Sequence, residues 1–138
     1  MGSKLDFTVD PKADRSPSEQ IAAALRLAIA SGALAPGERL PSVRQLAVDV
    51  LVNPNTVGKV WRDLERDGVL ESRPGDGVFV AAAAPALCRA ACRRELRLRL
   101  DEWMRDARRA GLGPDEIEEQ FLRANARRSS AARSGGER

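Results

Sequence analysis

The chain of 138 residues has room for one small domain with a short appendage, and a composition of 43% hydrophobic and 31% charged residues allows a modest core. No catalytic domain of ordinary size is expected beside it. The formal net charge is +3, but residues 1–84 carry 10 basic and 11 acidic side chains, whereas residues 85–138 carry 13 and 9. Overall charge therefore gives no argument for nucleic acid, and such a case must rest on individual side chains. The sequence shows no long apolar run and no signal-peptide pattern, so we expect a soluble, cytoplasmic protein.

The first helix is predicted by the string SPSE at residues 16–19, which combines an N-cap, a proline in the first turn and a capping-box acid. It should span about residues 17–30 and end at Gly32. The residues before it alternate in a way that predicts a short strand or an arm packed on the domain, through Leu5, Phe7 and Val9. Residues 38–40 are expected to add a second short strand.

Two helices joined by a tight turn are predicted between Leu40 and Leu70. Ser42 and Gln45 form a capping-box pattern, so the first of these helices should start at Val43. The second should start at the Asn-Pro pair of residues 53–54 and end near Gly68. Its first turns gather polar side chains on one face, and in a recognition helix this part reaches base edges in the major groove: Asn53, Asn55, Thr56, Lys59 and Arg62.

A hairpin is predicted after these helices. Two short apolar-rich runs, residues 69–72 and 78–81, flank the string RPGDG at residues 73–77, which supplies a glycine-bearing loop. Residues 81–84 then read as a short linker.

The tail is predicted to be helical from Pro85 to Gly111 and again from Pro114. Two helices cannot enclose their own apolar stripes well, so pairing with a second copy is expected. Cys88 and Cys92 share one helical face, and with no histidine and no further cysteine the chain lacks a zinc ligand set. They are either small core residues or a redox-sensitive bridge between two copies. Residues 128–138 are rich in Ser, Gly and Arg and are expected to be disordered.

Two separated strings carry a family resemblance. RLPSVRQLA at residues 39–47 and VNPNTVGKVWRDLERDGVLESRPGDGVFV at residues 52–80 resemble the winged helix-turn-helix domain of GntR-type bacterial transcription regulators. The VNPNTV string and the short helical tail are most similar to the YtrA-like branch. The resemblance covers about Asp6 to Val80 closely and the tail to about Ala126 more loosely.

The resemblance implies roles for individual residues. Arg44 matches an arginine associated with guanine recognition, which grips O6 and N7 in a bidentate manner, although the same residue type is often only a solvated helix charge. Asn53 serves as a cap or as a reader of bases, whereas Asn55 and Thr56 are better placed for base or phosphate contact. The remaining expected contacts are to phosphate or through close backbone approach, and they involve Lys59, Arg62, Arg73, Gly75 and Gly77.

Four positions depart from the family pattern. Leu51 stands in the turn where such regulators commonly carry Gly, and a left-handed Leu would cost about 1 kcal/mol or more unless the turn is wound differently. Gly58 lies inside the recognition helix, where Gly costs about 1 kcal/mol relative to Ala; it either lets the backbone approach DNA or is simply tolerated. In the hairpin loop, Pro74 and Asp76 stand where the family often has basic or small residues, and Asp76 would repel phosphate if it pointed that way. Contacts from the hairpin should therefore be weak.

The sequence thus predicts a mainly α protein with a small β wing. Its expected parts are a winged helix-turn-helix domain at 1–80, a linker at 81–84, a helical dimerisation segment at 85–127 and a disordered tail at 128–138. The expected function is a sequence-specific regulator of transcription, a repressor, acting as a homodimer on an inverted repeat in double-stranded DNA.

The alternative to this function is a winged-helix module for protein interaction with weak or lost DNA binding. An enzyme is not expected, because the chain has no histidine and no nucleophile set between acid and base partners. No cofactor and no metal are expected. An unidentified small-molecule effector, if one exists, should act at the dimer interface, since the tail is too short to enclose a metabolite pocket.

Overall fold

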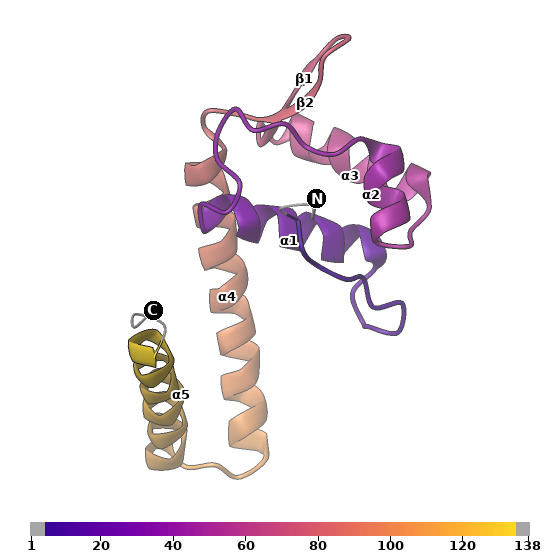
Figure 1. Cartoon of the computed structure of the whole chain (residues 1–138). Helices are drawn as coiled ribbons and strands as arrows, with labels where there is room; N and C mark the ends of the chain where they lie inside the picture. Colours follow the sequence, from indigo (N-terminus) through magenta and orange to yellow (C-terminus); the bar gives the residue numbers. More distant parts are fainter. Residues whose placement is uncertain (1–4, 135–138) are drawn as a thin grey trace. The chain divides into compact units, whose positions relative to one another are not determined.

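The computed structural model describes residues 5–134, with side chains as far as residue 127, as five helices and one antiparallel strand pair (Figure 1). The described part of the chain is therefore mainly α with a small β-hairpin, as predicted. It forms two compact units that meet between Arg94 and Glu95, here called the N-terminal unit and the C-terminal unit. No helix within 5–134 is long and apolar enough to cross a membrane.

Helix α1 (Pro17–Ala30) has the predicted bounds and the predicted cap. The Glu19 amide donates to the Ser16 hydroxyl at 3.3 Å, and the Ser16 amide donates to the Glu19 carboxylate at 2.9 Å. This capping box satisfies two of the amides that a helix start leaves free. The apolar side of α1 is fully buried in the core of the N-terminal unit, through Ile21, Leu25 and Ile29.

The residues before α1 form an arm and not a strand. Leu5 is buried, and Phe7 and Val9 pack against the core, so the alternating side chains do dock on the domain. The backbone of Asp10 pairs with a side chain of α1: its amide donates to the Gln20 carbonyl oxygen at 2.9 Å, and its carbonyl accepts from the Gln20 amide nitrogen at 2.8 Å. A side-chain partner thus takes the place of a neighbouring strand.

Helices α2 (Val43–Asp49) and α3 (Pro54–Arg66) form the predicted pair. Leu46 and Ala47 of α2 pack into the same core as the buried side of α3, which comprises Val57, Val60, Trp61 and Leu64. In the turn between them, Leu51 adopts φ 56°, the left-handed conformation that the sequence raised as one alternative. Its side chain is 92% exposed, so no packing compensates for this conformation.

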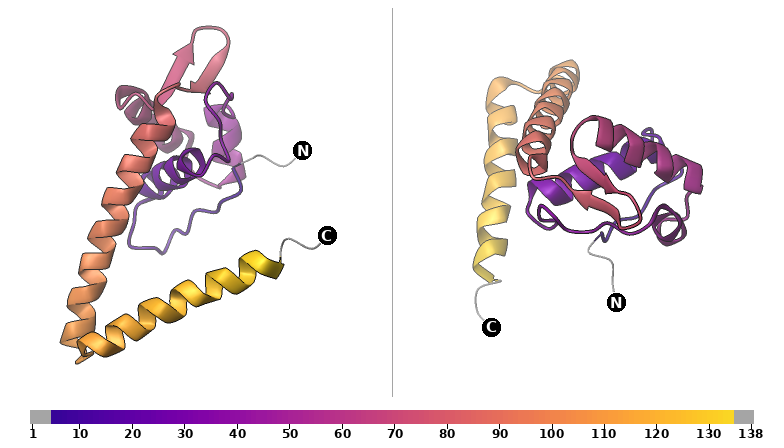
Figure 2. Two further views of the ribbon diagram at one scale, coloured as in Figure 1. Left: turned by 90° about the vertical axis from the view of Figure 1, so that its left-hand side faces the viewer. Right: turned by 90° about the horizontal axis from the view of Figure 1, so that it is seen from above.

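Strands β1 (Leu70–Arg73) and β2 (Gly77–Val80) form the predicted hairpin, which extends beyond the helices of the N-terminal unit (Figures 1 and 2). The expected strand at 38–40 is reduced to one bridge, Arg39 opposite Phe79, on the free edge of β2. The Val80 amide donates to the Glu38 carbonyl at 2.9 Å and the Leu40 amide to the Val78 carbonyl at 2.8 Å. Too few residues run straight here to form a strand.

Helix α4 (Ala84–Arg109) begins inside the N-terminal unit, one residue earlier than expected, where Ala84 and Cys88 are fully buried in the core. In the C-terminal unit, the remainder of α4 is followed by a turn and by α5 (Pro114–Ser134), which folds back from it (Figure 2). Ala107 and Ile117 are buried beside this turn, and the rings of Trp103 and Phe121 meet edge to face at 5.4 Å.

The expected disordered tail, residues 128–138, lies only partly in the described chain. Helix α5 continues to Ser134, seven residues beyond the predicted end of the helical segment, while residues 135–138 lie outside the described residues, as do residues 1–4.

Candidate nucleic-acid interface

The start of α3 is built by its cap. The Asn53 side-chain oxygen accepts from the Asn55 amide at 2.8 Å, and Pro54 occupies the first helical position, where a missing N–H is not needed. The capping role weighed for Asn53 is therefore present. This use occupies its side-chain oxygen and leaves the amide nitrogen as the group able to reach a ligand.

One face of α3 is polar and open. Asn55, Lys59 and Arg62 are exposed and follow each other at spacings of four and three residues, which places them on the same side of a helix. Thr56 is half-buried at the edge of this face. Within residues 5–134, neither Lys59 nor Arg62 forms an ion pair with an acid. Their charges are therefore available to an anionic partner.

Arg44 occupies the first turn of α2 and is exposed. The preceding residue, Val43, lies beside α3, because a Cβ placed on Gly58 would stand 4.0 Å from a Val43 methyl group. The start of α2 is thus packed against α3 near Gly58.

The hairpin supplies a second set of predicted residues. Arg73 and Gly75 are exposed, and Gly75 has φ 75° at the tip, where a Cβ would meet no atom within 4 Å. Gly77 has φ 125°, and a Cβ there would stand 2.8 Å from Nε of Arg39. Gly77 is therefore required by its backbone conformation, and a side chain there would also displace the Arg39 guanidinium. Arg39 is not among the residues predicted from the sequence, because its neighbour Gly77 lies 38 positions away and no local pattern links the two.

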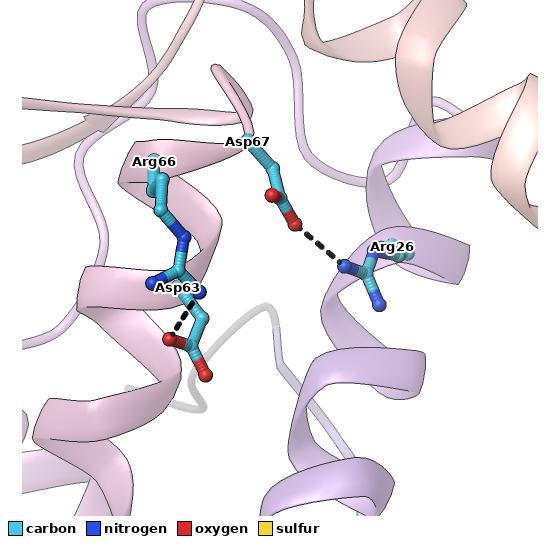
Figure 3. A network of polar contacts seen from close by, with 4 residues as sticks. All are labelled: Arg26, Asp63, Arg66 and Asp67. Carbon is cyan, nitrogen blue, oxygen red and sulfur yellow. Dashed lines mark hydrogen bonds and ion pairs between the residues drawn. The ribbon is translucent and has the colours of Figure 1, made fainter.

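Polar contacts hold the far end of α3 in place. Arg26 of α1 and Asp67, the C-cap of α3, form an ion pair at 3.2 Å, and Arg66 pairs with Asp63 at 2.8 Å within the helix (Figure 3). Such partly exposed pairs contribute roughly 0–1 kcal/mol, so they orient more than they stabilise. The Ser72 hydroxyl donates to the Glu65 carboxylate and ties β1 to the same helix. Helix and hairpin are thereby fixed to each other.

The two cysteines lie in the first part of α4. Burial raises the pKa of the Cys88 thiol, the neighbouring Cys92 raises it further, and Arg26 opposes the rise. Cys88 is therefore a neutral core thiol, while Cys92 is half-buried. Among the described residues, no group of three or more His, Cys, Asp or Glu side chains is placed to hold a metal ion.

Several known proteins are similar to this chain in sequence or in structure. Residues 17–80 match the family described as bacterial regulatory proteins, gntR family. The HTH-type transcriptional repressor YtrA of Bacillus subtilis is 32% identical over 118 residues, which are 86% of this chain and 91% of the relative. A transcriptional antiterminator from Listeria monocytogenes EGD-e has a similar solved structure, with a TM-score of 0.67 and 31% identity over 89% of this chain and 92% of that chain. The solved structure of AraR(DBD) in complex with operator ORX1 matches 54% of this chain and 95% of that chain, with a TM-score of 0.50 and 25% identity.

Proposed function

The chain belongs to the GntR family of bacterial regulatory proteins, in its YtrA-like branch, and from this premise we propose that it is a sequence-specific repressor that binds an inverted-repeat operator as a homodimer. It is a transcription regulator with a winged helix-turn-helix DNA-binding domain. The operator symmetry, the homodimer and the sign of regulation are the proposed parts.

The exposed face of α3 carries the proposal. Its cations lie on a helix whose other side is locked into the core, so they reach a ligand without any loss of packing. A helix of this kind enters the major groove with its first turns against base edges. The relative AraR(DBD), solved in complex with operator ORX1, supports double-stranded DNA as the ligand.

The proposed contacts divide by chemistry. Arg44 reads guanine by a bidentate contact, and Asn55 and Thr56 reach base edges or phosphates from the first turn of α3. Asn53 caps the helix and adds its amide nitrogen. The contacts that position the domain without reading sequence come from Lys59 and Arg62 on α3 and from Arg73, Gly75 and Gly77 on the hairpin.

The C-terminal unit supports the homodimer. Large apolar side chains of its two helices are exposed, which in a folded protein marks a surface that another chain covers. Two identical chains pairing about a two-fold axis present two recognition helices to two half-sites of an inverted repeat. An effector, if the protein has one, would act at this pairing surface.

The test is selection of binding sites from a random pool of duplex DNA with the full chain, followed by titration of the selected site against a scrambled duplex at several salt concentrations. We expect an inverted repeat, and Arg44→Ala should weaken the preference for it by about 1–3 kcal/mol. Arg66→Ala is the matched control, because this arginine is also exposed but pairs with Asp63 at the other end of α3. Equal weak binding to every sequence would contradict specific repression.

The alternative is a winged-helix module that binds another protein. Asp76 in the hairpin loop and the unusual Leu51 and Gly58 favour it, since each weakens a feature that DNA binding uses. Absence of binding to any duplex at moderate salt would favour this alternative. Neither proposal assigns catalysis, since the named relatives are regulators.

A further inference from the structure

The face of the hairpin that carries Arg73, Gly77 and Phe79 is here called its outer face. It also receives Arg39, from the segment before α2. In an antiparallel pair, residues directly opposite each other point their side chains to the same face. Arg39 stands opposite Phe79, and Arg73 stands opposite Gly77. Gly77 and Phe79 are two residues apart on β2 and share a face. Arg39 and Arg73 therefore project onto the same face from opposite edges of β2.

The two guanidinium groups occupy neighbouring places on that face. Cζ of Arg73 lies 4.1 Å from the centroid of the Phe79 ring. The Arg39 group lies over Gly77, with Nε, Nη2 and Cζ at 2.8, 3.2 and 3.4 Å from the position that a Cβ would take. Phe79 is only 8% exposed although it points outward, and the arginine stacked on its ring helps to cover it.

No acid neutralises these two groups in the described part of the chain. Within residues 5–134 neither Arg39 nor Arg73 has an ion pair, although Glu71 stands opposite Phe79 on the same face. Two neighbouring like charges repel each other, and an anion between them removes the repulsion. The planar fork of guanidinium matches phosphate oxygens in particular.

In the function proposed above, the exposed face of α3 contacts DNA. The hairpin is joined to α3 by the hydrogen bond between Ser72 and Glu65, so it lies at a fixed position relative to that face. We propose that Arg39 and Arg73 together form one phosphate-binding site on the outer face of the hairpin, which grips the DNA backbone. Arg39 is the new member of the interface, and the absence of a side chain at Gly77 leaves room for its guanidinium. This inference rests on the proposed DNA binding and adds a sequence-independent contact to it.

The experiment compares Arg39→Met, Arg73→Met and the double variant of the full chain, on the selected operator and on a scrambled duplex, over a series of salt concentrations. Methionine keeps an apolar stem over Gly77 and removes the charge. Loss of one phosphate contact makes the slope of log K against log salt shallower by about 0.9, which corresponds to roughly 15-fold weaker binding at 0.05 M salt and roughly 4-fold at 0.2 M. We expect the double variant to show this loss on both duplexes alike, with the ratio between them unchanged.

The singles identify the shared site. Both arginines hold one phosphate, so their effects on binding should be coupled. The free energy of binding lost in the double variant should therefore differ from the sum of the losses in the two single variants. Arg66→Met is the matched control and should leave the slope unchanged. Glu71→Gln, which removes the nearby carboxylate, should strengthen binding to both duplexes.

Several results would overturn the proposal. If Arg39→Met binds with the wild-type slope and affinity, Arg39 only packs on the hairpin; strictly additive losses would mean separate contacts and no shared site. Melting followed by circular dichroism shows whether each variant is folded, and Arg39→Lys, which keeps the charge but not the fork, replaces Arg39→Met if that variant unfolds, with an intermediate loss expected. If the wild-type protein binds duplexes without sequence preference, the proposed sequence-specific repression is contradicted. The phosphate site is still tested, because the salt series on the scrambled duplex needs no sequence preference. Wild-type protein that binds no duplex overturns both.

Discussion

The two units of the molecule differ in how far they bury their own apolar side chains. In the N-terminal unit the helices, the arm and the start of α4 close around one core that extends from Leu5 to Cys88. In the C-terminal unit, among residues 95–127, only Ala107 and Ile117 are buried, and six large apolar residues are exposed: Leu96, Leu98, Leu100, Trp103, Phe121 and Leu122. The same residue types thus complete a fold in one unit and leave a surface in the other. The first unit thus has a core of its own, whereas the second leaves exposed the surface that the proposed homodimer would cover.

Replacing Leu100 with Asp should have the largest effect, because it alters the exposed apolar surface that distinguishes the C-terminal unit. A charge in the proposed pairing surface would separate the two copies, so light scattering after gel filtration should show a monomer. Loss of the linked second half-site should weaken binding to the full operator by about 100-fold or more, while affinity for a single half-site stays close to wild type. Arg105→Asp, at an exposed position on the opposite side of α4 from the stripe of Leu96, Leu100 and Trp103, is the control and should remain dimeric. A Leu100→Asp protein that stays dimeric would contradict the assignment of this surface.

Truncating one leucine in each unit sharpens the contrast. Leu64 is fully buried, so Leu64→Ala should lower the free energy of unfolding of the N-terminal unit by about 2–5 kcal/mol. Leu98 of the C-terminal unit is 56% exposed, and Leu98→Ala should leave the free energy of unfolding of the N-terminal unit within about 0.5 kcal/mol of the wild-type value. Urea denaturation followed by tryptophan fluorescence measures the first, since Trp61 lies in the same core. Equal effects of the two changes would mean that the units are not separate.

Gly58→Ala tests whether the closed core of the N-terminal unit tolerates one more methyl group. The added Cβ would stand 3.5 Å from an Arg62 nitrogen and 4.0 Å from Val43, which are ordinary contacts, so the better helix propensity of Ala should stabilise the unit by about 1 kcal/mol. Thermal denaturation measures the gain. If stability rises while operator affinity falls, Gly58 is kept for close approach to DNA; a loss of stability would contradict the geometry.

Leu51→Gly addresses the one left-handed residue other than glycine in the described chain. Relief of the left-handed strain, partly offset by the entropy of Gly, should raise the free energy of unfolding by about 0.5–1 kcal/mol. Val48→Gly, at another exposed apolar position but inside α2, should instead lower it by a few tenths of a kcal/mol, roughly the propensity difference. The same sign for both changes in urea denaturation would show that the conformation of Leu51 is not strained.

The smallest effect concerns the thiols. Burial raises the pKa of Cys88 above the ordinary thiol value of 9.0, so its neutral form is favoured in the folded state. The folded state is therefore stabilised by this group below pH 9.0, and the contribution declines as pH rises through the raised pKa. Cys88→Ala should remove this decline in melting temperature. Iodoacetamide at pH 8 should modify half-buried Cys92 before Cys88, and equal rates in native protein would contradict the burial.

Most of the fold was predictable because its determinants are local. The SPSE string gave the start of α1 at Pro17, the Asn-Pro pair gave the start of α3, and the RPGDG string gave the hairpin, since caps and turns depend on a few adjacent residues. The arm at residues 5–10 was less determined by sequence. Its alternation suits a strand, but Gln20 of α1 binds the backbone of Asp10, and such a tertiary contact leaves no local pattern.

The candidate interface was predictable in part. Spacing alone places Asn55, Lys59 and Arg62 on one face of α3, and the structure has that face open. The DNA contacts themselves stay predictions. Arg39 contacts Gly77 because the segment before α2 runs along the free edge of β2. This tertiary arrangement leaves no pattern in the sequence near either residue, so the contact could not be predicted.

The space over Gly77 also means that the hairpin is not a portable module. A hairpin with a side chain at the position of Gly77 would displace the guanidinium of Arg39, and a hairpin moved elsewhere from this chain would lose the guanidinium that rests on it. Engineering of hybrid regulators should therefore exchange residue 39 together with the hairpin that carries Gly77.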